Sequence, residues 1–128
     1  MISGVNNITF IHNNLMWQDT KINIEQKLNR LELKIYCKKL VLANRVDWRV
    51  PTYKEMLSLI DYTKNTPASI DKIKYIIPLK YWTSSVSTLE KEKNWYIDFD
   101  YGTSGIDSDL VRHHIRCVRN ISKLEGEY

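Results

Sequence analysis

Cationic side chains gather near the end of the sequence, in the segment RHHIRCVRNI. If this segment is a β-strand, Arg112, His114 and Arg116 lie on one face, because successive side chains of a strand point to opposite faces. Such a face would present three cationic groups to an acidic polysaccharide, and His114 would add charge as the pH falls toward about 6.5. The alternative is that Arg116 and Arg119 pair with carboxylates and the remaining cations form a solvated face.

Metal binding is a second chemistry that the residue types allow. His113 and His114 are neighbours on the predicted strand, so their rings point to opposite faces and cannot chelate one ion together. Carboxylates near a glycine-containing turn offer the oxygen ligands that Ca²⁺ prefers. They are Asp98, Asp100, Asp107 and Asp109. We favour solvent-facing carboxylates over a calcium site, so we expect no metal and no cofactor.

Motifs of known catalytic sites are absent from the sequence. It contains no G-x-S-x-G, no phosphate-cradling glycine loop, no H-E-x-x-H and no C-x-x-C. We therefore expect a protein that has no catalytic residues and acts by binding.

The stretch DWRVPTYKEM marks the junction between an extended segment and a helix. Pro51 is tolerated just outside a helix, and Thr52 with Glu55 has the T-x-x-E spacing of a reciprocal capping box. Trp48 is expected to fill the space between the sheet and the helix that follows. Arg49 is expected to bind loop carbonyls or a carboxylate through its planar set of donors. The alternative role for Arg49 is an anion-binding or catalytic group, and we favour the structural role.

Hydrophobic periodicity places these residues on an α+β framework. Residues 8–18 predict a hairpin that turns at Asn13-Asn14. Apolar residues at three- and four-residue steps predict one helix over 23–43, closed by Asn44 in left-handed geometry. A second helix is predicted over 53–62, followed by an irregular stretch. Strands are predicted at KYWTSS, NWYIDFDYG and RHHIRCVRNI.

Length and charge limit the organisation and the partners. The 128 residues favour a single domain over 1–128, with a core at about 8–119 and a flexible tail over 120–128. The net charge of +4 is spread along the chain, so nucleic acid is not an expected partner. No apolar stretch is long enough for membrane insertion. An acidic polysaccharide or a protein surface is the expected partner, and oligomers are compatible with the sequence.

Two cysteines and the first residues bear on the compartment. Cys37 and Cys117 are far apart in the sequence, so they are either two buried thiols or one long-range disulfide. The N-terminus has no signal-peptide features, which leaves a cytosolic protein or a trimmed mature chain.

Five landmarks in order resemble the Lcl C-terminal domain family: LMWQD, YCKKL, DWRVPTYKEMLSLID, YWTSS with NWYIDFDYG, and IRCVR. The resemblance covers about residues 8–119. It implies a C-type lectin-like fold, with two helices flanking a small twisted antiparallel sheet, a loop-rich upper half and the two ends of the chain brought together. More distantly, the same landmarks are similar to those of formylglycine-generating-type domains.

The resemblance carries further expectations. It implies a disulfide between Cys37 and Cys117, and hence a periplasmic, cell-surface or secreted location. The family's named member is associated with sulfated glycosaminoglycans, which implies an adhesion or binding module for acidic polysaccharide. The alternative is a structural or assembly domain that binds a protein through its loops.

Overall fold

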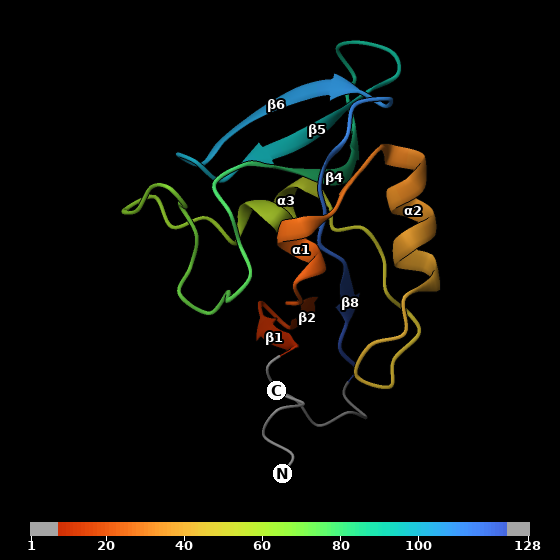
Figure 1. Ribbon diagram of the computed structural model, residues 1–128. Helices are drawn as coiled ribbons and strands as arrows, with labels where there is room; N and C mark the ends of the chain where they lie inside the picture. Colours follow the sequence, from red (N-terminus) through yellow and green to blue (C-terminus); the bar gives the residue numbers. More distant parts are fainter. Residues whose placement is uncertain (1–7, 123–128) are drawn as a thin grey trace.

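Residues 8–122 are the part of the chain that the computed structural model describes. Their fold is α+β, as predicted, with short helices and two small sheets (Figure 1). The helices are α1 (Ile22–Glu25), α2 (Arg30–Lys39) and α3 (Tyr53–Leu57). The strands are β1 (Thr9–His12), β2 (Leu15–Gln18), β3 (Lys27–Leu28), β4 (Lys80–Val86), β5 (Lys93–Asp98), β6 (Thr103–Ser108), β7 (His113–His114) and β8 (Val118–Asn120).

The first sheet joins the two ends of the described chain. Its strand order is β1-β2-β8, and both pairings are antiparallel. The predicted hairpin is confirmed, with Asn13 and Asn14 at φ 53° and 59° in the turn. Trp17 of β2 pairs with Val118 of β8, so the ends lie together as expected. Asn120 ends β8 instead of starting a tail, and residues 123–128 lie outside the described part.

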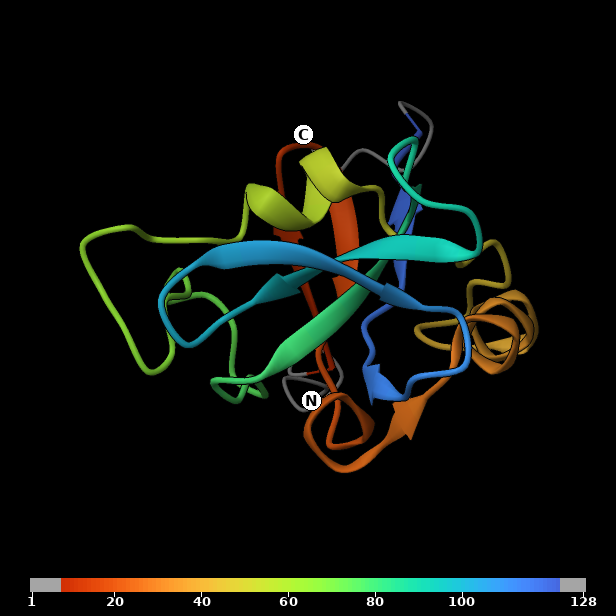
Figure 2. The same ribbon diagram turned by 90° about the horizontal axis from the view of Figure 1, so that it is seen from above.

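The second sheet has the order β3-β7-β4-β5-β6, and its long strands form the upper layer in Figure 1 and are seen from above in Figure 2. Its long strands β4, β5 and β6 are antiparallel neighbours. The expected antiparallel sheet is confirmed in these pairings, and it includes one short parallel contact, where His114 of β7 pairs with Tyr81 of β4. Both residues are buried, so this short parallel contact lies inside the molecule.

The single helix predicted over 23–43 is wrong. The chain leaves α1 at Gln26 in extended geometry, and Asn29 begins α2 with a capping box. The Asn29 side chain accepts from the Glu32 amide at 2.9 Å while Glu32 accepts from the Asn29 amide at 3.0 Å. Asn44 has the predicted left-handed geometry, but it lies in a separate turn after α2 ends at Lys39.

Helix α3 begins as predicted and ends earlier than residue 62. The Thr52 hydroxyl accepts from the Glu55 amide at 3.2 Å, and Glu55 Oε1 accepts from the Thr52 amide at 2.9 Å, which confirms the capping box. The Ser58 hydroxyl then donates to the Glu55 carbonyl at 2.6 Å. The predicted irregular stretch is present but begins earlier than expected, at residue 58, and runs to residue 79; its buried Leu59 and Ala68 belong to the core.

The core has two hydrophobic clusters, and the second contains a disulfide between Cys37 and Cys117. This bond ties α2 to the segment before β8, as the resemblance implies. Trp48 is 3% exposed and packs in this second cluster with Leu33 and Cys37 of α2. The expectation that Trp48 packs against the helix following it is therefore wrong, because Met56 of α3 belongs to the first cluster. In residues 8–122 no helix has the length and apolar character needed to cross a bilayer.

Arg49 has the structural role that the sequence favours. Its Nη1 and Nη2 donate to the two Glu55 carboxylate oxygens at 2.8 Å each, and Nη2 donates to Asn120 Oδ1 at 2.7 Å. These hydrogen bonds lower the pKa of Glu55 below its ordinary value. The Arg49 backbone also exchanges two hydrogen bonds of 2.8 Å with Val118. Arg49 therefore connects β8 to the start of α3.

We predict that Arg49→Ala lowers the free energy of unfolding by about 1 to 3 kcal/mol, because Glu55 and Asn120 lose a charged donor at a half-exposed site. Arg49→Lys should be intermediate, since it keeps the charge and loses the two-pronged contact. Thr52→Ala should cost about 1 kcal/mol through the lost helix cap. Chemical denaturation measures all three. Wild-type stability of Arg49→Ala would refute the structural role.

The disulfide gives a second prediction. It closes a loop of 80 residues, so replacing both cysteines by serine should lower the free energy of unfolding by about 4 kcal/mol on the loop-entropy model. Protein purified without reductant and then denatured should show no thiol that reacts with a maleimide. Two reactive thiols in that protein would contradict the bond.

Candidate functional site

The predicted binding face of Arg112, His114 and Arg116 does not exist in the structure. Residues 115–117 separate β7 from β8, so the segment is not one strand and its side chains do not alternate on one surface. His114 is 4% exposed and Arg116 is fully buried. Arg112 is exposed, and its Nη2 donates to Glu32 of α2 at 3.1 Å. The predicted ligand-binding assignment is wrong for this surface, because His114 and Arg116 are buried and only Arg112 is exposed.

Arg116 instead lies at the centre of a buried polar network. Its Nη1 donates to the Gln18 carbonyl and lies 3.4 Å from Asp19 Oδ1 and 3.3 Å from Asn23 Oδ1. Its Nη2 donates to the Tyr75 carbonyl. A buried guanidinium needs such partners because removing it from water is costly. The Arg116 side chain therefore stabilises the fold.

The second arginine of the R-C-V-R ending is also engaged. Arg119 is 3% exposed, and its Nε donates to Asp47 Oδ1 at 2.6 Å. This contact joins β8 to the residue before the W-R-V-P-T box. Both arginines of the ending thus contribute to the scaffold.

The four aspartates considered for calcium are spread over separate contacts. Asp98 accepts from the Asp100 amide at 3.0 Å, and Asp100 accepts from the Thr66 hydroxyl at 2.8 Å. Asp107 lies 2.9 Å from His113 Nε2, and Asp109 accepts from the side-chain amide of Asn94. Within residues 8–122 no three His, Cys, Asp or Glu side chains are grouped so as to hold a metal ion.

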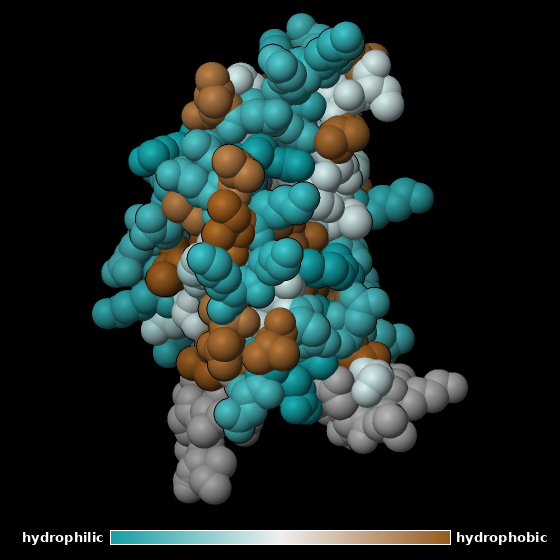
Figure 3. Space-filling model, turned by 90° about the vertical axis from the view of Figure 1, so that its right-hand side faces the viewer, coloured by the Kyte–Doolittle hydropathy of each residue, from teal (hydrophilic) through white to brown (hydrophobic). Residues whose placement is uncertain are grey.

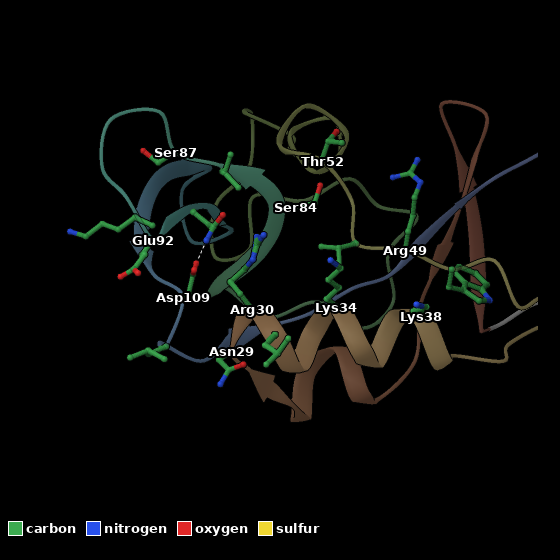
Figure 4. A pocket seen from close by; sticks show the side chains of 17 residues that line it. Asn29, Arg30, Lys34, Lys38, Arg49, Thr52, Ser84, Ser87, Glu92 and Asp109 are labelled. Atoms are coloured by element: carbon green, nitrogen blue, oxygen red, sulfur yellow. Dashed lines mark hydrogen bonds between the residues drawn. The ribbon is translucent and has the colours of Figure 1, made fainter.

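A groove of about 1060 Å³ lies between α2 and the end of β4 (Figure 4). One wall comes from α2 and its N-cap, with Asn29, Arg30, Leu31, Lys34 and Lys38. The other wall contains Trp48, Arg49, Val50 and Thr52 together with Ser84 and Val86. The second wall is held in place because the Ser84 amide donates to the Pro51 carbonyl at 2.8 Å. Residues 92–94 and 109–110 close one end.

The α2 wall carries a cationic stripe, defined as Arg30, Lys34 and Lys38. These residues are spaced by four, so they lie above one another on one helix face, and Figure 4 shows all three on the side of α2 that lines the groove. Arg30 donates to the Thr83 carbonyl. Neither Lys34 nor Lys38 has a hydrogen-bond or ion-pair partner among the described residues. Like charges at this spacing destabilise a helix unless an anion offsets them.

Sequence reasoning missed this stripe, although its signal is present as three basic residues at four-residue steps. The predicted helix placed Leu31 and Ile35 in its buried stripe, yet these side chains are 68% and 46% exposed. Leu33 and Cys37 are the buried positions of α2. On this side of the molecule apolar islands alternate with hydrophilic side chains (Figure 3).

Burial also changes the expected effect of pH. Neither ring nitrogen of His114 has a hydrogen-bond partner among the described residues. Burial lowers the pKa of His114, with Lys27 and His113 acting in the same direction. Burial likewise lowers the pKa of His113, although Asp107 opposes this effect. Both rings therefore favour the neutral form, and the expected gain of surface charge at His114 in mild acid is wrong.

These shifts predict lower stability in mild acid. Above about pH 6.5 both the folded and the unfolded histidines are neutral, and below it the unfolded chain takes up protons more readily. The free energy of unfolding should therefore fall between pH 7 and pH 5. His114→Phe should make this fall shallower, because the ring can no longer titrate. Denaturant titrations at several pH values measure both slopes, and a stability that rises toward pH 5 would contradict the burial of the neutral rings.

The chain was compared with protein families, curated proteins and solved structures. No curated protein and no solved structure matches the chain, so the C-type lectin-like fold stays a prediction. The model of the Lcl C-terminal domain family matches residues 8–119, from the start of β1 to within β8. That range contains both arginine motifs, the disulfide and the groove. The chain belongs to the Lcl C-terminal domain family.

Proposed function

We propose that this domain is a non-enzymatic, extracytoplasmic binding module, and that its ligand is an acidic polysaccharide held in the groove beside α2. The observation that carries the proposal is the cationic stripe. Two of its three charges, on Lys34 and Lys38, are without a partner in the described structure while facing a groove large enough for a ligand. A linear polyanion can place successive anionic groups along such a stripe.

The other charges of the groove are acidic or already paired in part, which limits the attraction for a polyanion. Arg49 is committed to Glu55, and its side chain points away from α2 (Figure 4). Lys93 lies 3.3 Å from Glu90. Exposed contacts of the remaining lysines are individually weak and are screened by salt. Useful affinity would then require several domains on one ligand chain.

The extracytoplasmic location is supported by the disulfide, because such bonds persist in oxidising compartments.

A protein partner is the second candidate, and the apolar margin of the groove favours it. Leu31 on the α2 wall is 68% exposed, while Val86 and Leu110 on the other margins are 65% and 82% exposed. Exposed apolar side chains around one groove are typical of protein interaction sites. Binding through these side chains would depend little on salt, which separates this candidate from the polysaccharide.

The test compares two charge-matched variants on a heparin column. The double variant with Lys34→Gln and Lys38→Gln should bind heparin about three- to tenfold more weakly than the wild type and elute at lower salt. Lys21→Gln with Lys39→Gln removes the same charge from exposed lysines that do not line the groove. This control should elute close to the wild type, and so should Arg112→Gln.

Equal elution of the groove variant and its control would exclude the groove as the polyanion site. Failure of the wild type to be retained on heparin at low salt would leave the protein partner as the favoured candidate.

A further inference from the structure

One tryptophan stands apart from the other three. Trp17 and Trp82 are fully buried and Trp48 is 3% exposed, each inside a core cluster. Trp95 of β5 is only partly buried and belongs to neither cluster. An indole contributes most to stability when it is buried. The position of Trp95 at the surface is therefore not explained by packing of the core.

Trp95 lines a second hollow, of about 590 Å³, between the start of α3 and the end of β4. The Tyr53 ring forms a neighbouring wall, with its centroid 5.4 Å from that of Trp95 and its plane inclined by 61°. The Tyr53 hydroxyl is held 3.0 Å from Ser104 Oγ, which fixes this wall. The two rings thus form a rigid aromatic corner that is open to solvent.

Polar groups border the aromatic corner. Ser85 Oγ accepts from the Tyr53 amide at 2.9 Å, so its hydroxyl hydrogen is free to donate to a ligand. Lys54 also lines the hollow and is exposed. A flat apolar surface with a few fixed donors is the usual composition of a small-ligand site.

The hollow continues from the groove. Thr52 and Val86 line both cavities, so a ligand that leaves the α2 wall past Thr52 enters the hollow directly. The two cavities differ in character, since the groove presents the cationic stripe and the hollow presents two aromatic rings. A single extended ligand can therefore meet charge in one and an aromatic surface in the other.

We propose that the hollow is a subsite for one pyranose ring of the saccharide, stacked on Trp95 and hydrogen-bonded by Ser85 and Lys54. The inference rests on the proposed function. One face of a pyranose ring carries mainly C–H groups, which pack on the electron-rich face of an indole. Its hydroxyls point outward from the rim, where the Ser85 and Lys54 donors lie. The stripe then supplies attraction for anionic groups, and the hollow recognises the ring itself.

Tryptophan fluorescence tests this directly, because Trp95 is the most accessible of the four indoles to the quencher acrylamide. A heparin-derived oligosaccharide should protect the wild type from quenching. Trp95→Leu should bind it about five- to tenfold more weakly, with circular dichroism confirming the fold. The Lys34 and Lys38 double variant at saturating oligosaccharide should keep the protection of Trp95.

The outcomes separate the two proposals. Wild-type binding without protection of Trp95, or unchanged affinity in Trp95→Leu, would overturn the subsite and leave the groove in place. Absence of any binding to the oligosaccharide would overturn both proposals. Protection of Trp95 by a proline-rich peptide but not by the oligosaccharide would assign the aromatic corner to a protein ligand and overturn the saccharide subsite.

Discussion

The buried guanidinium of Arg116 is the constraint on which the arrangement of the whole chain depends. A charge with no exposure to water must be surrounded by acceptors. Here they come from the end of β2 at Gln18 and Asp19, from Asn23 in α1, and from the Tyr75 carbonyl in the irregular segment. Asp19 also accepts from the Tyr75 amide at 2.8 Å. One side chain thus joins the segment before β8 to residues 18–23 and to Tyr75, both of which are distant from it in sequence.

The recognisable motifs of this chain therefore build the scaffold, and the binding chemistry lies elsewhere. The W-R-V-P-T box caps α3 and joins it to β8 through Arg49, and the R-C-V-R ending supplies Arg116 and the disulfide. Neither motif offers a free functional group to a ligand in the described structure. The W-R-V-P-T box contributes part of the lining of the groove and the hollow, but the charged and aromatic groups offered to a ligand come from outside both motifs, notably Lys34, Lys38 and Trp95. A shared scaffold of this kind does not determine the ligand.

Local patterns predicted those elements that local contacts define. The Asn13-Asn14 turn, the Thr52 and Glu55 capping box and the strand around Ile97 each follow from neighbouring residues, and each is confirmed. The break before α2 was missed because the periodicity of the apolar residues continued across Asn29, whose capping box with Glu32 has the same logic as the one that was recognised. The α+β class needed only the order of the elements.

The candidate site was less predictable, because it depends on which side chains the tertiary structure buries. Alternation would have exposed Arg116 on a continuous strand, yet a break after His114 and the network of acceptors bury it. The groove arises from two walls that are distant in sequence, joined where Ser84 donates to Pro51. No pattern within one segment reports that contact. The spacing of Arg30, Lys34 and Lys38 was the one local signal of the site.

The assignment of the ligand to the groove beside α2 is tested most directly by an amide chemical-shift titration of the ¹⁵N-labelled domain with a sulfated oligosaccharide. If the ligand occupies the groove and the hollow, the largest shifts fall on lining residues of α2 and β4, with a further shift at the indole N–H of Trp95. These lining residues are Arg30, Leu31, Lys34, Lys38, Ser84 and Val86. Residues 112–119 should change little, because their cations are engaged in the scaffold. Shifts concentrated on 112–119, with none along α2, would rule out the groove as the binding site.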